Sequence, residues 1–160
     1  MTKRITALFL LLAVLLIGGC NISQKLTAAE YKDELMSGYE EFMASRIKIA
    51  EIMIDAEQGN RISLGSSEFE GACKDLENSM KRFEKMNPPD NYKDKHKKLV
   101  KSLDDYRDWL KAAKKAAECT TPEEFDKALN AANGTLDTEN GFLKQYLDMF
   151  IEVNKEADIG

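Results

Sequence analysis

The sequence predicts an all-α protein: an up-down-up-down four-helix bundle preceded by a short apolar helix at the N-terminus. Ala, Leu, Lys, Glu and Met are abundant, and they favour helices. Only three prolines interrupt 160 residues. Apolar residues recur every three or four positions, which places them on one helix face. The links between these amphipathic segments are short, and short links favour antiparallel neighbours.

The first bundle helix is expected over residues 28–57. Thr27 and Glu30 form a capping box, in which each side chain bonds the other's backbone N–H. Gly, Asn and Ser residues between positions 58 and 66 predict a loop after this helix. The predicted buried face contains Tyr31, Leu35, Tyr39, Phe42, Ile49 and Met53.

The second helix is expected over residues 68–87, with Ser67 and Glu70 as a second capping box. The third is expected over residues 91–118, capped by Asp90 or Asn91 after two prolines. The buried face of the second contains Phe69, Cys73, Leu76, Met80 and Phe83. That of the third contains Tyr92, His96, Leu99, Leu103, Tyr106, Leu110, Ala113 and Ala117.

The fourth helix is expected over residues 122–156. Thr121 and Glu124 form its capping box, and Pro122 occupies the first helical position. Asn-Gly pairs at 133–134 and 140–141 are potential breaks, yet the apolar pattern keeps its phase across both. We therefore expect one long helix, with a split into two helices as the alternative. The expected buried face contains Phe125, Leu129, Ala132, Leu136, Leu143, Tyr146 and Phe150.

The N-terminal segment has the features of a secretory signal peptide. Lys3 and Arg4 precede an apolar run over residues 5–17. The run is about 13 residues long, short of the ~20 that a membrane-spanning helix needs. Two glycines and a cysteine follow the run, so that residues 16–20 read Leu-Ile-Gly-Gly-Cys.

The residues Ile17-Gly18-Gly19-Cys20 resemble the bacterial lipobox. The resemblance implies cleavage before Cys20 and lipidation of its thiol, and hence an extracytoplasmic protein anchored to a bacterial membrane. An ordinary signal peptide with an incidental cysteine is the alternative. The expected organisation is a signal peptide over 1–19, a lipidated cysteine with a short tether over 20–27, and a bundle over 28–157. The resemblance does not say which membrane carries the anchor.

A short tether would keep the bundle close to the bilayer. In an up-down-up-down bundle, the turn between helices two and three then returns to the membrane side. Basic residues are concentrated there although the chain without residues 1–19 has net charge −7. They are Lys81, Arg82, Lys85, Lys93, Lys95, Lys97, Lys98 and Lys101. We expect this basic tip to contact anionic lipid or envelope polymer, with a solvated surface as the alternative. The negative net charge and the export signal argue against nucleic-acid binding.

The cysteines and the single histidine are expected to be structural. Measured along the bundle axis from the predicted turn between the second and third helices, Cys73 and Cys119 lie about 20 Å apart. A disulfide needs Cα atoms within ~7 Å. His96 lies on a buried face, where a packed boundary residue is more common than a metal ligand. The run Pro88-Pro89…Tyr92…His96…Leu99 resembles a pattern in uncharacterised bacterial helical lipoproteins, which implies no known chemistry.

A polar layer is expected halfway along the bundle, from Arg46, Tyr106, Trp109, and Glu139 or Asn140. An Arg46–Glu139 pair there would fix the helix register. A small-ligand site formed by these residues is the alternative. The sequence contains no recognisable catalytic, metal or cofactor motif. It therefore predicts a non-enzymatic lipoprotein that presents a helical bundle to envelope components or to a protein partner.

Overall fold

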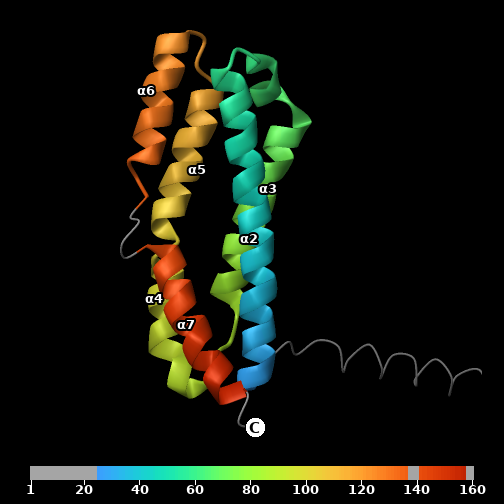
Figure 1. Ribbon diagram of the computed structural model, residues 1–160, viewed down its shortest axis with the longest axis vertical. Coiled ribbons are helices and arrows are strands. Elements are labelled where there is room, and N and C mark those ends of the chain that lie inside the picture. Colours follow the sequence, from blue (N-terminus) through green and yellow to red (C-terminus); the bar gives the residue numbers. More distant parts are fainter. Residues whose placement is uncertain (1–24, 137–140, 158–160) are drawn as a thin grey trace, which may run out of the picture.

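The computed structural model describes residues 25–136 and 141–157, and within them it contains helices and no strand (Figure 1). The all-α fold class is confirmed. The chain runs up the bundle, returns, rises again and descends, so that consecutive long segments are antiparallel. The α-helices are α2 (Ala28–Glu57), α3 (Ser67–Lys85), α4 (Lys93–Lys101), α5 (Asp104–Ala117), α6 (Pro122–Asn133) and α7 (Phe142–Ala157); the 3₁₀ turns are η1 (Arg61–Gly65) and η2 (Asp90–Tyr92).

Helix α2 has the predicted boundaries and the predicted capping box. The Glu30 backbone N–H donates to Thr27 Oγ1 at 3.2 Å, and the Thr27 backbone N–H donates to Glu30 Oε2 at 2.8 Å. After the helix, Gly59 has φ 110°, a left-handed conformation that a side chain would oppose. The predicted loop that follows contains η1.

Helix α3 begins one residue earlier than the sequence suggested. The Phe69 backbone N–H donates to Ser66 Oγ at 3.2 Å, so the cap is Ser66 and not Ser67. Gly38 on α2 permits a close approach to α3: a Cβ there would lie 3.2 Å from Phe83 Cζ. This contact places the C-terminal half of α3 firmly against α2.

The prediction of one continuous third helix is wrong, because the segment is divided into α4 and α5. The Ser102 hydroxyl donates to the Leu99 carbonyl at 2.7 Å, and the Leu103 N–H donates to the Val100 carbonyl at 3.2 Å. Such local bonds tighten the turn and compete with the regular helical pattern. The predicted Asp90 or Asn91 cap is also wrong, because both residues belong to η2 and Tyr92 directly precedes α4.

The prediction of one long fourth helix is wrong, and the alternative of two helices is correct. α6 ends at Asn133 and α7 begins at Phe142. The apolar phase is not kept across the break. α7 buries Phe142, Tyr146, Met149 and Val153, whereas Leu143, which we expected inside, is 38% exposed. The break lets α7 rotate relative to α6.

The core follows the predicted apolar faces of the other helices closely, and all the expected core residues of α3 are buried. α7 packs against α2 and α4, while α6 packs mainly against α5. Near mid-bundle, aromatic rings from four helices meet: the Phe42 centroid lies 4.8 Å from Tyr106 and 4.6 Å from Phe142, and Phe83 lies 5.2 Å from Phe142.

The predicted signal peptide, lipobox and Cys20 lie outside the described residues. Within the described ranges, no helix combines the length and apolar character needed to cross a membrane.

Candidate functional site

The start of α2 lies beside the turn that joins α3 to α4. The Leu26 backbone N–H donates to the Asn87 carbonyl at 3.0 Å, and Lys25 forms an ion pair with Asp90. The N-terminal end of the described chain therefore shares one pole of the bundle with α4, at the bottom of Figure 1. Any attachment upstream of residue 25 would emerge at this pole.

Three of the eight predicted basic residues are held by carboxylates. Arg82 is only part-exposed and binds both Glu34 at 2.9 Å and Glu41 at 2.5 Å, which fastens α3 to α2. Lys93 pairs with Asp90 at 2.8 Å, and Lys95 pairs with Glu152 of α7. These three side chains contribute to the structure and have less charge to offer a ligand.

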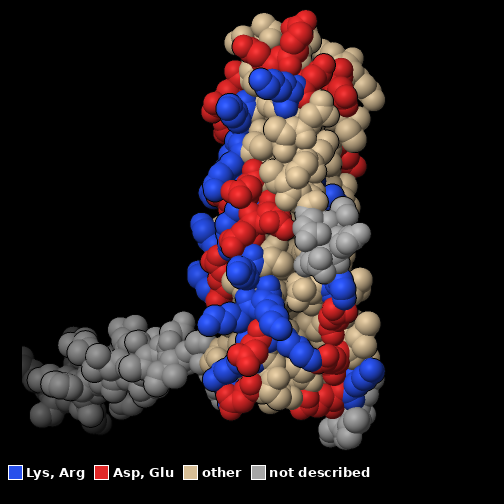
Figure 2. Space-filling model, turned by 90° about the vertical axis from the view of Figure 1, so that its left-hand side faces the viewer, with Lys and Arg blue, Asp and Glu red and all other residues tan. Residues whose placement is uncertain are grey.

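The other five are exposed and form no ion pair with any described residue. We call them the basic face: Lys81, Lys85, Lys97, Lys98 and Lys101. Those on α3 line an open groove with Leu26 and Asn87, and those on α4 line a neighbouring groove with Arg107. Figure 2 shows Lys and Arg side chains gathered along one edge and over the lower half of the molecule.

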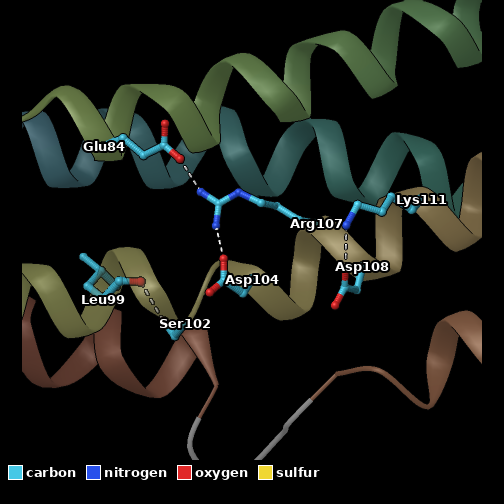
Figure 3. Close-up of polar contacts among 7 residues, drawn as sticks. All are labelled: Glu84, Leu99, Ser102, Asp104, Arg107, Asp108 and Lys111. Atoms are coloured by element: carbon cyan, nitrogen blue, oxygen red, sulfur yellow. Dashed lines mark hydrogen bonds and ion pairs between the residues drawn. The ribbon is translucent and has the colours of Figure 1, made fainter.

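Arg107 connects the two parts of this region. Its guanidinium bonds Glu84 on α3 and, at 2.5 Å, Asp104 at the start of α5 (Figure 3). About two helix turns nearer the N-terminus of α3, Glu77 pairs with Lys114 at 2.5 Å. The C-terminal half of α3 thus reaches α5 through these side chains, and it also packs against α4. The eight basic residues lie on the C-terminal part of α3 and on α4, on either side of the α3–α4 turn, and their contact with lipid or polymer stays a prediction.

This register also corrects the argument about the cysteines. Cys73 lines a groove with Ala117 and Glu118, so it lies near the level of Cys119 and not about 20 Å away. Both thiols are nevertheless free. The expectation of unpaired thiols is confirmed, but the predicted height difference was wrong because it assumed a tight turn between helices of equal height.

The two thiols are expected to react at very different rates. Cys73 is buried and burial raises the pKa of its thiol to about 11, so little nucleophilic thiolate forms at neutral pH. Cys119 is half-buried. Brief iodoacetamide treatment of the native protein, followed by peptide mass spectrometry, should label Cys119 and leave Cys73 unlabelled until denaturant is added. Equal labelling of both in the native protein would contradict the structure.

His96 is buried in the core rather than at its boundary, where it was predicted. Its Nδ1 lies 2.7 Å from the hydroxyl of Tyr31, and its Nε2 has no hydrogen-bond partner among the described residues. Burial lowers the pKa of the imidazole, and the smaller opposing influence comes from the Phe83 backbone. The side chain is therefore neutral and structural near pH 7.

The predicted mid-bundle layer is formed in part. Arg46 Cζ lies 5.7 Å from the centroid of the Tyr106 ring, a cation–π contact, and Trp109 is buried in the core. Arg46 Nε is buried with no hydrogen-bond partner among the residues described. Glu139 and Asn140 lie outside the described ranges, so the predicted Arg46–Glu139 pair stays a prediction. None of the grooves described above includes Arg46, Tyr106 or Trp109.

Across residues 25–136 and 141–157, no group of three or more His, Cys, Asp or Glu side chains is arranged to hold a metal ion. Comparisons with protein-family models, curated proteins and solved structures found no match to this chain.

Proposed function

We propose that the chain is a non-enzymatic, extracytoplasmic lipoprotein, anchored to a bacterial membrane through lipidated Cys20. In this proposal the bundle rests its basic face on phosphate-bearing envelope material, either anionic lipid headgroups or an anionic polymer. The lipobox resemblance supports the anchor. The absence of a recognisable catalytic motif in the sequence supports a binding role over an enzymatic one.

The observation that carries the proposal is the position of the basic face relative to the N-terminal end of the described chain. The Leu26–Asn87 backbone bond places the start of α2 beside the α3–α4 turn. Only a few residues separate this point from Cys20. A chain anchored there would hold α4 near the membrane surface without any rearrangement of the bundle.

The unpaired lysines make such a contact favourable. Each basic residue near an anionic membrane surface contributes about 1 kcal/mol, and the attraction fades within a Debye length. Lys97, Lys98 and Lys101 lie on one short helix and line one groove. Glu84, Asp94 and Asp104 line the same groove, but none of them forms an ion pair with these three lysines, so the ammonium groups are available to phosphate.

Charge reversal on α4 should abolish this binding. We expect a Cys20→Ser chain to cosediment with vesicles containing phosphatidylglycerol, and to remain unbound with pure phosphatidylcholine. The triple variant Lys97→Glu, Lys98→Glu and Lys101→Glu should weaken binding at least about tenfold, because three attractions become repulsions. Cosedimentation at low and at 0.5 M salt measures the effect, and high salt should weaken the unsubstituted chain.

A triple variant with the same charge change elsewhere serves as the control: Lys74→Glu, Lys115→Glu and Lys127→Glu, three exposed residues on α3, α5 and α6. It should retain most of the binding if the basic face, and not net charge, is responsible. Soluble polyphosphate added as a competitor distinguishes the two sources of phosphate. A lipid contact would be refuted if the unsubstituted chain does not bind the vesicles, or if both triple variants bind them equally. If the chain then binds polyphosphate and the α4 variant does not, the basic face is assigned to an anionic polymer.

The second candidate is a small-ligand-binding lipoprotein that uses the mid-bundle layer. The buried, unpartnered Arg46 Nε favours it. Tyr106 and Trp109, however, are buried in the packed core. The basic face therefore has the stronger claim.

A further inference from the structure

Helices α2 and α7 together expose a continuous apolar surface that neither the core nor the basic face explains. We call it the α2–α7 face: its exposed members are Met36 and Ile47 on α2 with Leu143, Leu147 and Ile151 on α7, and Met43 and Phe150 are partly buried between them and the core. Leu147 is 54% exposed and Ile151 is 51% exposed. The predicted helical pattern placed Leu143 inside the core and therefore did not indicate this face.

The two helices bring their exposed apolar residues to one seam. The Tyr39 ring of α2 stacks on the Tyr146 ring of α7 with centroids 4.0 Å apart, and Tyr146 stacks in turn on Phe150. Met36 and Met43 flank Tyr39 at helical spacing, and Leu143 and Leu147 flank Tyr146 and Phe150. Isolated exposed apolar residues are ordinary, but a continuous strip along a helix pair indicates an interaction surface.

Charged residues border the strip with opposite signs on its two sides. Asp33 and Glu40 are exposed on α2 and form no ion pair with a described residue. On α7, Lys155 is also exposed and without an ion pair among the described residues, and Lys144 pairs only with its neighbour Asp148 at 2.7 Å. The α2 border thus carries two unpaired carboxylates, with Lys32 beside Asp33, while the α7 border carries two lysines and Asp148.

We propose that two copies of this chain associate through the α2–α7 face, about a two-fold axis parallel to the bundle. Such an axis places α2 of each copy opposite α7 of the other. The axis also places each residue at the same height along the bundle in both copies. Because Tyr39 lies level with Tyr146 and the helices are antiparallel, Glu40 lies level with Lys144, and Asp33 lies within about one turn of Lys155. In the dimer, Glu40 of one copy therefore faces Lys144 of the other, around a shared apolar centre.

Other occupants and other axes fit less well. A two-fold axis across the bundle would set α2 against α2, so the two acidic borders would repel each other. An anionic bilayer would meet the same acidic border of α2. The parallel axis also leaves residue 25 of both copies at one pole, which is compatible with two chains anchored in one membrane.

Cysteine cross-linking in the full chain tests this arrangement. In a Cys119→Ser background, the double variant Glu40→Cys with Lys144→Cys should form a covalent dimer under mild oxidation. Each single variant should give at least about tenfold less dimer. In this arrangement residue 40 of one copy lies far from residue 40 of the other, and the same holds for residue 144, so their Cα atoms are beyond the ~7 Å that a disulfide spans. Non-reducing electrophoresis of whichever cell fraction contains the chain gives the result, so the outcome does not depend on anchoring.

A further substitution separates a specific interface from random collision. Leu147→Glu, at a residue too exposed to be needed for folding, should reduce the cross-linked dimer of the double variant at least about fivefold by placing a charge in the apolar centre. Ala131→Glu makes the same change at an exposed position on α6 and should leave cross-linking unchanged. Three results would each show that the proposal is wrong: a double variant that stays monomeric, single variants that cross-link as well as the double variant, or a Leu147→Glu substitution without effect. The first result is expected if a bilayer covers this face.

Discussion

Phe42→Ala should lower the free energy of unfolding by about 3–5 kcal/mol, the range for removing a fully buried aromatic side chain. Phe42 has no exposed surface. Its ring packs edge-on against Tyr106 at 4.8 Å and tilted against Phe142 at 4.6 Å, so it joins α2 to α5 and α7. Because the surrounding rings come from separate helices, they cannot all collapse into the cavity.

Urea denaturation followed by circular dichroism measures the change, with equal slopes confirming a comparable unfolding reaction. Ile54→Ala is the control on the same helix, since its side chain is 52% exposed and its removal should cost no more than about 0.5 kcal/mol. A loss under about 1 kcal/mol for Phe42→Ala would show that the aromatic cluster is not where the stability of the bundle resides.

Most of the core could be predicted from the sequence because helical periodicity is a local property. The Thr27–Glu30 capping box and the apolar face of α2 depend only on residues near each other in the chain. The prediction failed where two local signals conflicted. At Asn133-Gly134, turn-forming residues interrupt a continuing apolar pattern, and we followed the pattern. In the structure the helix ends at this pair, and Leu143 on the next helix is exposed.

The candidate site was predictable in composition but not in arrangement. The sequence identifies a concentration of lysines, yet it cannot show which of them are neutralised by distant carboxylates. Lys95 pairs with Glu152, and Arg82 pairs with Glu34 and Glu41. The extended link after α3 shifts the register between α3 and the α4–α5 segment. That shift lets the Arg107 guanidinium reach Glu84.

Below about pH 6.5 the protein should lose stability with a slope of up to about 1.4 kcal/mol per pH unit, and His96 should be the cause. Burial lowers the pKa of His96 in the folded state. The unfolded chain therefore binds a proton at a pH where the folded protein does not, and acidification favours unfolding. The loss begins at the unfolded pKa of histidine and ends when the pH falls below the folded pKa. Above pH 7 this group should contribute no pH dependence.

His96→Gln tests the assignment because glutamine can still bond the Tyr31 hydroxyl but does not titrate in this range. Urea midpoints between pH 5.5 and 7.5 should be nearly constant for the variant and should fall with acidification for the parent. The ion pairs of Asp90 lower the pKa of its carboxyl to about 2, so its contribution is lost only below about pH 4 and does not overlap this window. Asp90→Asn should accordingly leave the slope between pH 5 and 6.5 unchanged. If parent and His96→Gln lose stability in parallel, then another group is responsible and the buried Tyr31–His96 pair does not govern acid sensitivity.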